Sequence, residues 1–134
     1  MPSHTPDPSG DTASANPPIL VVDDDAETCH MIRWALEEEG LTVETAADGQ
    51  RGLELAIRRR PRLVILDMGL PLLNGAELAA KLRAAYGDGL PVLLITADGH
   101  VVEKARRVGA QAYLTKPFDL DTLCVTVQEV LGRG

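Results

Sequence analysis

The sequence has few aromatic residues and no long hydrophobic run. Among its 134 residues are one tryptophan, two tyrosines and one phenylalanine. Four aromatic side chains are too few for a row of stacking platforms for nucleic-acid bases. The longest aliphatic runs, at residues 19–22, 63–66 and 92–95, are far shorter than the roughly 20 apolar residues of a membrane-spanning helix. The sequence therefore predicts neither base stacking nor a membrane span.

Positive charge and cysteine are also scarce. The chain has 13 Lys and Arg against 20 Asp and Glu, a net charge of −7, which disfavours a partner bound through phosphate backbones. We therefore expect no direct nucleic-acid binding. Cys29 and Cys124 fall in helical patterns and lie near no set of Cys and His residues that could bind a metal together, which predicts two buried, reduced thiols. Because the N-terminus also lacks a basic start and an apolar stretch, no secretory signal is visible and we expect a cytoplasmic protein.

The composition changes at residue 19. Residues 1–18 are dominated by Pro, Ser, Thr, Asp and Gly and contain little that could bury apolar surface, so we expect a disordered tail. The remaining length fits one domain, which we place at residues 19–132.

Within that domain, short apolar runs alternate with amphipathic stretches. Strands are expected at residues 19–23, 42–45, 63–66, 92–95 and 112–114. The first helix is expected at about residues 26–39, with Gly40 as its left-handed C-cap. Asp48 and Asp119 are expected N-caps of later helices, and Asn74-Gly75 is expected to open another helix. The inward positions expected on the helices are Cys29, Ile32, Ala35, Leu36, Leu53, Ala56, Ile57, Leu78, Ala79, Leu82, Val101, Ala105, Val108, Leu120, Leu123, Val127 and Leu131.

Strand-helix units joined by short links predict a doubly wound α/β fold, with five parallel strands and five helices on the two faces of the sheet. Ligands of such sheets bind at the carboxyl ends of the strands. Polar residues stand at four of these ends: Asp23, Asp24 and Asp25 at the end of the first strand, Asp67 at the third, Thr96 at the fourth and Lys116 at the fifth.

This set of side chains suits phosphoryl chemistry. Converging carboxylates repel one another unless a cation compensates them, and an all-oxygen site favours magnesium. A lysine can offset phosphate charge, a threonine hydroxyl can donate to a phosphate oxygen, and a carboxylate can act as the nucleophile that forms an aspartyl phosphate.

Four stretches, ILVVDDD, LVILDMGLP, LLITA and YLTKPF, together resemble the receiver domain of bacterial-type response regulators (CheY-like). The resemblance runs from Ile19 to Phe118, and the helical pattern extends it to about Leu131. It implies a flavodoxin-like strand order, 2-1-3-4-5.

The resemblance also implies a role for each matching residue. Asp67 would be the phosphoacceptor. Magnesium would be held by Asp23, Asp24 and Asp67 together with the backbone carbonyl of Gly69. Thr96 and Tyr113 would rearrange on phosphorylation. Lys116 would pair with the phosphoryl group, next to a cis bond to Pro117.

Two positions that set phosphoryl lifetime in the family are unusual here. Gly69 stands two residues after Asp67, where many relatives carry a side chain near the water that attacks the phosphoryl group. Asp98 stands two residues after Thr96, at the second of these positions. The sequence therefore does not predict how long the phosphoryl group persists. Asp25, the third acid of its run, is expected to cap the first helix rather than to bind metal.

The leading hypothesis is a stand-alone receiver, because the chain stops soon after the last helix. A histidine kinase or phosphotransfer protein would phosphorylate it, and its fourth helix, fifth strand and fifth helix would contact a protein target. One alternative is a magnesium-dependent phosphohydrolase, but such enzymes resemble a DxDx[TV] pattern, and the residues after Asp67 lack the second acid. Another alternative is a degenerate receiver that acts only as a docking module.

Overall fold

Five strands form one parallel sheet in the order β2-β1-β3-β4-β5. The computed structural model describes residues 17–70, 74–97 and 100–133. The strands are β1 (Ile19–Val22), β2 (Val43–Ala46), β3 (Leu63–Asp67), β4 (Val92–Thr96) and β5 (Ala112–Thr115). The α-helices of the described residues are α2 (Ala26–Glu38), α3 (Gly49–Arg59), α4 (Gly75–Tyr86), α5 (Val101–Val108) and α6 (Leu120–Arg133), with one 3-10 turn, η1 (Gly87–Gly89). The predicted fold class, strand order and number of helices are confirmed.

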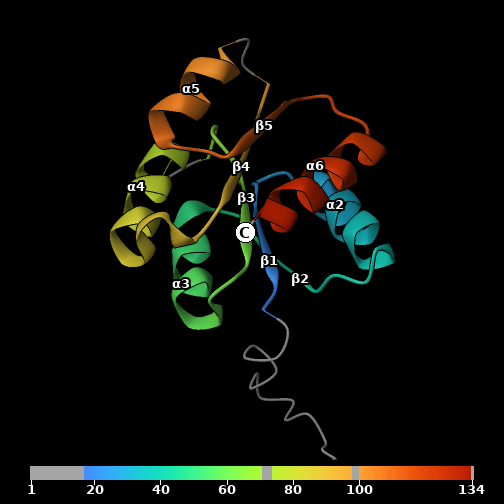
Figure 1. The fold of residues 1–134 in the computed structure, drawn as a ribbon, viewed down its shortest axis with the longest axis horizontal. Coiled ribbons are helices and arrows are strands. Elements are labelled where there is room, and N and C mark those ends of the chain that lie inside the picture. Colours follow the sequence, from blue (N-terminus) through green and yellow to red (C-terminus); the bar gives the residue numbers. More distant parts are fainter. Residues whose placement is uncertain (1–16, 71–73, 98–99, 134) are drawn as a thin grey trace, which may run out of the picture.

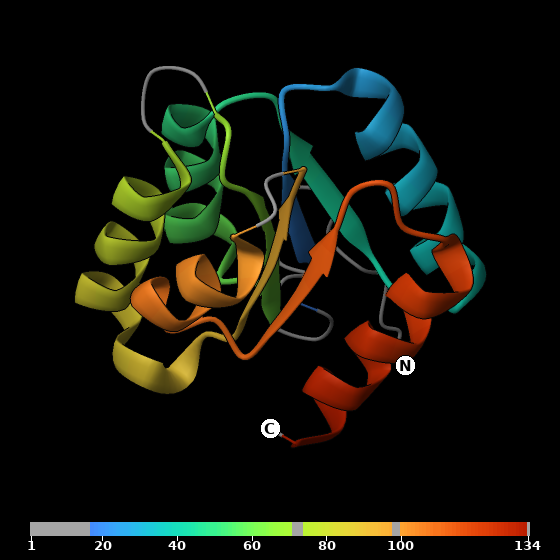
Figure 2. The same ribbon diagram turned by 90° about the horizontal axis from the view of Figure 1, so that it is seen from above.

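Helices cover both faces of the sheet. Helices α3, α4 and α5 lie on one side, and α2 and α6 lie on the other (Figures 1 and 2). Successive strand residues face opposite sides: Leu20 and Val22 pack with the first group of helices, and Ile19 and Val21 pack with the second. Strands buried on both faces are apolar throughout, as β1 is.

The helix ends follow the predicted capping residues. The side chains of Asp25, Asp48 and Asn74 each accept a hydrogen bond from a backbone N–H of the helix that follows. The carboxylate of Asp119 accepts one from the backbone N–H of Thr122, at 2.7 Å. Gly40 has a φ of +86°, the left-handed conformation expected where α2 ends.

One predicted helix face was partly wrong. Ile57 does not face the core, because it is 58% exposed, whereas Leu55 and Ala56 of that helix are buried. On α6, the predicted Leu120 and Leu131 pack against the core while partly buried, and Val130 is a core position that the prediction omitted.

Three further details differ from the sequence prediction. Cys124 is half-buried rather than buried, although both thiols are free as expected. The first strand ends at Val22, so Asp23 follows it. The second strand begins one residue later than predicted, at Val43.

Most of the predicted N-terminal tail, residues 1–16, lies outside the described residues. Pro18 belongs to the described part, and its carbonyl accepts a hydrogen bond from the backbone N–H of Arg62 at 2.9 Å. This bond joins the residue before β1 to the residue before β3, at the amino end of the two neighbouring strands.

Candidate functional site

Three carboxylates converge at the carboxyl end of the sheet. Asp23 follows β1 and Asp67 ends β3, and these two strands are neighbours. One oxygen each from Asp23, Asp24 and Asp67 lies within 4.8 Å of the others. Asp23 is 1% exposed and Asp67 is 7% exposed, whereas Asp24 lies at the surface. The predicted acidic cluster therefore exists, with two buried members and one that faces solvent.

Lys116 is the cation of this cluster. Its Nζ lies 2.9 Å from Oδ2 of Asp23 and 3.5 Å from Oδ2 of Asp67. Its backbone N–H donates to the carbonyl of Thr96 at 2.8 Å, and its bond to Pro117 is cis, as predicted. Lys116 thus bridges the two buried carboxylates from the end of β5.

Local backbone turns fix the two buried carboxylates. The N–H of Asp25 donates to Oδ1 of Asp23 at 2.9 Å, and the N–H of Gly69 donates to Oδ1 of Asp67 at 3.1 Å. Each carboxylate therefore has one oxygen held by its own loop and the other close to Lys116. Asp25 itself caps α2 and accepts from the hydroxyl of Thr28 at 2.8 Å, as expected for a cap.

Burial and charge act on the site in opposite directions. Burial raises the pKa of Asp23, and the nearby Asp67 raises it further, while the hydrogen bond from the N–H of Asp25 and the positive charge of Lys116 partly offset this. Burial alone would lower the pKa of Lys116, but the carboxylates of Asp23 and Asp67 together hold that pKa above its usual value. The site thus contains more negative charge than one lysine compensates.

These residues fit a hard divalent cation. Oδ2 of Asp23 is fully buried and accepts no well-directed hydrogen bond, although Nζ of Lys116 lies at ion-pair distance. A buried carboxylate oxygen in this state gains from a metal ion. Asp23, Asp24 and Asp67 supply only oxygen ligands, which favours magnesium over zinc.

The structure brings Thr96 to the site but not Tyr113. Thr96 is 4% exposed and lines a pocket of about 310 Å³ with Asp67, Gly69 and Lys116. Tyr113 lies on β5 and is 45% exposed, and it is not among the residues that line this pocket. Gly69 contributes its backbone next to Asp67, and Asp98 lies outside the described residues.

Sequence reasoning missed Lys104, which also lines this pocket from α5. The signal that could have found it is its position near the beginning of the helix that follows Thr96. A residue there lies close to the carboxyl end of β4. The missed apolar members of the lining, Met68 and Ala97, directly follow the strand ends.

Cys29, on α2, contacts the backbone of the loop that carries Asp23. Its thiol donates to the backbone carbonyl of Asp23 at 3.2 Å, and burial raises its pKa to about 11. The thiol is therefore protonated and supports the loop after β1.

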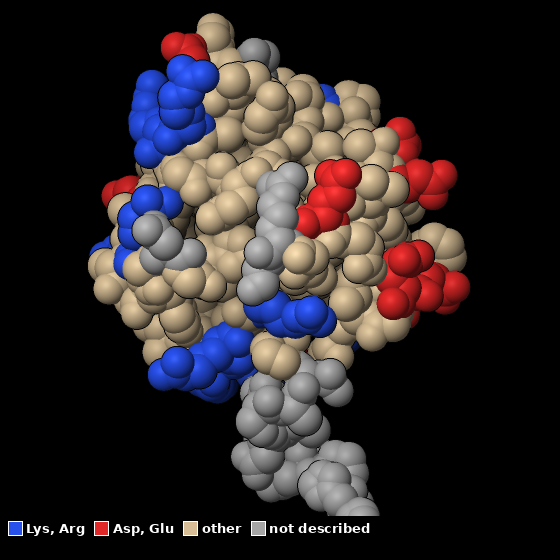
Figure 3. Space-filling model, viewed as in Figure 1, with Lys and Arg blue, Asp and Glu red and all other residues tan. Residues whose placement is uncertain are grey.

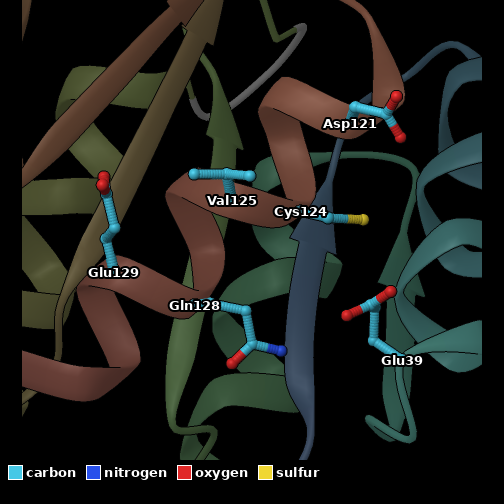
Figure 4. Close-up of a pocket in the computed structure, with 6 residues that line it drawn as sticks. All are labelled: Glu39, Asp121, Cys124, Val125, Gln128 and Glu129. Atoms are coloured by element: carbon cyan, nitrogen blue, oxygen red, sulfur yellow. The ribbon is translucent and has the colours of Figure 1, made fainter.

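A second hollow lies away from the carboxylate cluster. It runs along α6 and the end of α2, and Glu39, Cys124 and Gln128 are among its lining residues (Figure 4). Acidic side chains gather on this side of the molecule, whereas Lys and Arg gather over the side of α3, α4 and α5 (Figure 3). The hollow shares no residue with the pocket at Asp67.

The family model described as the response regulator receiver domain matches residues 19–128. The chain belongs to this family. The match covers all five strands and most of α6, and it includes every residue of the carboxylate cluster.

Individual receiver proteins agree with this assignment. The chain is 41% identical over 117 residues to "Response regulator MprA" of Mycobacterium sp. (strain KMS), covering 86% of this chain and 50% of that protein. It is 41% identical over 118 residues to "Probable transcriptional regulatory protein SilR" of Salmonella typhimurium, covering 87% and 51%. The chain thus spans about half the length of these curated relatives.

Solved receiver structures share the fold over nearly their whole length. Chemotaxis protein CheY4 of Vibrio cholerae superposes with a TM-score of 0.79 at 34% identity, covering 86% of this chain and 98% of that one. A CheY-like receiver domain protein of Methanospirillum hungatei JF-1 superposes with a TM-score of 0.81 at 29% identity, covering 88% and 95%. The receiver is a signalling switch of two-component systems.

None of the helices in the described ranges combines the length and the apolar character that a bilayer crossing requires.

Proposed function

We propose that Asp67 accepts a phosphoryl group and that this modification switches the protein's contact surface. The observation that supports this most directly is the arrangement of Asp23, Asp24 and Asp67 around Lys116 at one edge of the sheet. Three carboxylates with one lysine suit the binding of a metal ion and a transferring phosphoryl group.

The reaction requires a nucleophilic oxygen and compensation of charge. An oxygen of Asp67 attacks the phosphorus of a phosphohistidine, the new O–P bond forms as the P–N bond breaks, and the imidazole keeps the electron pair and takes up a proton. Lys116 lies 3.5 Å from Asp67 and offsets the charge of the phosphoryl oxygens. Water attack on the phosphorus later releases inorganic phosphate and restores the carboxylate.

Asp23, Asp24 and Asp67 would hold magnesium, with the backbone carbonyl of Gly69 as a further ligand. The ion supplies neutralisation of the charge on the phosphoryl oxygens during transfer. Of the three acids, Asp24 is at the surface and is free to meet an ion that keeps several waters, as magnesium does.

Thr96 and Tyr113 would link phosphorylation of Asp67 to a change in the contact surface of the protein. The buried hydroxyl of Thr96 lies in the pocket with Asp67, where it can donate to a phosphoryl oxygen, and the exposed Tyr113 can then change its position. The surface that responds is formed by α5, β5 and α6, the fourth helix, fifth strand and fifth helix of the receiver family. Exposed apolar residues on it, such as Val102 and Val125, suit a protein target.

We expect the phosphodonor to be a histidine kinase or phosphotransfer protein, in the cytoplasm, and the protein to catalyse only its own phosphorylation and dephosphorylation. A phosphohydrolase acting on other substrates is not favoured, because Gly69 stands where the second acid of that pattern would be. The prediction that the receiver acts without an attached output domain stays a prediction, since the chain spans half of its curated relatives.

Phosphorylation by acetyl phosphate tests the proposal. With magnesium, intact-protein mass spectrometry should detect one added phosphoryl group, and a chelator should abolish the gain. Asp67→Asn should gain nothing, whereas Asp121→Asn, an exposed acid on α6, should behave like wild type. An equal gain in wild type and Asp67→Asn would overturn the assignment.

A further inference from the structure

The pocket that contains Asp67 has a second lysine. Lys104 lines it from α5, and Lys116 lines it from the loop after β5. We propose that Lys104 binds an oxygen of the phosphoryl group and so serves as a second phosphate-binding cation of this receiver. This inference rests on the proposed phosphorylation of Asp67.

The packing of α5 directs Lys104 to the pocket. Val101 and Ala105, on the same helix, are 6% and 4% exposed and pack with the core cluster that includes Leu94 of β4. Their burial fixes the rotation of the helix. Lys104 is partly buried, and its backbone N–H donates to the carbonyl of His100 at 3.1 Å. It therefore lies in the first turn of α5, close to the carboxyl end of β4.

The charges of the site need a second lysine once Asp67 is phosphorylated. Lys116 is shared between Asp23 and Asp67 at 2.9 and 3.5 Å. Phosphorylation replaces one carboxylate charge by a phosphoryl charge of about −1.5 to −2. The phosphoryl group, Asp23 and Asp24 together would then carry about one unit more negative charge than magnesium and Lys116 compensate. Lys104 brings the sum close to zero.

The long, flexible stem of lysine allows this contact without a rearrangement of the helix axis. The bond would link the phosphoryl group directly to α5, an element of the responding surface. This link is separate from the one through Thr96, since Lys104 and Thr96 lie on different elements. Loss of Lys104 should therefore weaken phosphoryl binding while leaving the fold intact.

Beryllofluoride, which adds to a carboxylate oxygen and imitates a phosphoryl group, is a suitable probe. Its binding in the presence of magnesium is measured by ¹⁹F NMR titration of the full chain. Lys104→Gln should bind it roughly fivefold more weakly than wild type, the effect of one partly exposed charged contact. Lys104→Arg should retain binding within about twofold, because the charge is kept. Lys81→Gln, at an exposed lysine of α4, should match wild type.

Magnesium affinity without beryllofluoride separates a charge effect from damage to the site. Removing a positive charge near three carboxylates should not lower magnesium affinity, so Lys104→Gln should weaken beryllofluoride binding while magnesium affinity stays equal or rises. Damage would weaken both, and this result would overturn the inference. Equal beryllofluoride affinity in Lys104→Gln and wild type would also overturn it. Failure of wild type itself to bind beryllofluoride would instead refute the proposed phosphorylation of Asp67.

Discussion

At the scale of single residues, burial determines what each acid of the cluster can do. Asp23 is almost fully buried, and one of its oxygens has no well-directed hydrogen bond, so its charge depends on Lys116 or on a metal ion. Asp67 is held by the N–H of Gly69, with its second oxygen near Lys116. This orientation leaves Asp67 directed into the pocket where a phosphoryl group would arrive.

Cys29 should be chemically inert in the folded protein. Its pKa of about 11, against 9.0 for a thiol exposed to water, lowers its thiolate fraction at pH 7 about hundredfold. Because only the thiolate reacts, a pulse of iodoacetamide followed by peptide mapping should find Cys29 alkylated at least about hundredfold more slowly than in urea-unfolded protein. The rate should rise as pH increases toward 11.

The second thiol provides the internal comparison. Cys124 is half-buried, and its pKa is also raised by burial, but it lies nearer the surface and should react before Cys29. Cys124→Ser should leave the slow rate of Cys29 unchanged. Alkylation of both thiols at one rate in the folded protein would contradict the burial of Cys29.

Individual site residues were predictable to different degrees. Asp23, Asp67 and Lys116 could be assigned because each directly follows or ends a strand, and parallel strands bring such positions together. Lys104 was missed: its place in the first turn of α5 indicates the right edge of the sheet, but whether its side chain reaches the pocket depends on how α5 is rotated against the sheet. Strand position specifies only the edge of the sheet, whereas helix rotation depends on packing.

At the scale of elements, sequence predicted helix ends better than helix faces. Asp48 and Asp119 cap helices as expected, because a cap is a local interaction between one side chain and the next turn. The inward face of α3 was partly wrong: Ile57 is exposed and Leu55 is buried. Which face of a short helix is buried depends on its neighbours, and on α3 Gly52 is buried against β1.

Gly52 should be required for this close approach. A Cβ added there would lie 2.9 and 3.0 Å from the two γ-carbons of Val22, so no rotation of the buried valine side chain relieves both contacts. Alanine gains about 1 kcal/mol in helix propensity, but overpacking costs about 1–3 kcal/mol. Gly52→Ala should therefore lower the free energy of unfolding by about 1 kcal/mol in urea denaturation.

Gly132→Ala is the matched control. Gly132 lies in the last turn of α6, and a Cβ there meets nothing within 4 Å. Its substitution should be neutral or slightly stabilising. If Gly52→Ala proves as stable as Gly132→Ala, α3 can move away from β1 without cost, and the close packing is not a constraint.

At the scale of the whole molecule, the parallel sheet explains why residues far apart in sequence form one site. Asp23, Asp67 and Lys116 come from the ends of three different strands. The strands β1 and β3 are buried on both faces, so the core fixes the two carboxylates, whereas β5 is positioned by its pairing with β4 and by the partly buried Ala112 and Leu114. The same architecture occurs in solved receiver structures that share about a third of the sequence.

Because the site joins three strands, magnesium should stabilise the entire fold. A ligand that binds only the folded state adds RT ln(1 + [L]/Kd) to the free energy of unfolding, about 2.7 kcal/mol at a hundredfold excess over Kd.

This stabilisation should depend on pH through Asp23, because burial raises the pKa of Asp23 above 3.8. In metal-free protein, stability due to this group is therefore present below pH 3.8 and is lost as pH rises through the folded pKa. Magnesium binds the ionised form, so its stabilising effect, measured by thermal unfolding across pH, should grow through the same window. Asp23→Asn should abolish most of this effect, and Asp121→Asn should retain it. If magnesium stabilises wild type, Asp23→Asn and Asp121→Asn equally, the ion does not bind at the cluster that contains Asp23.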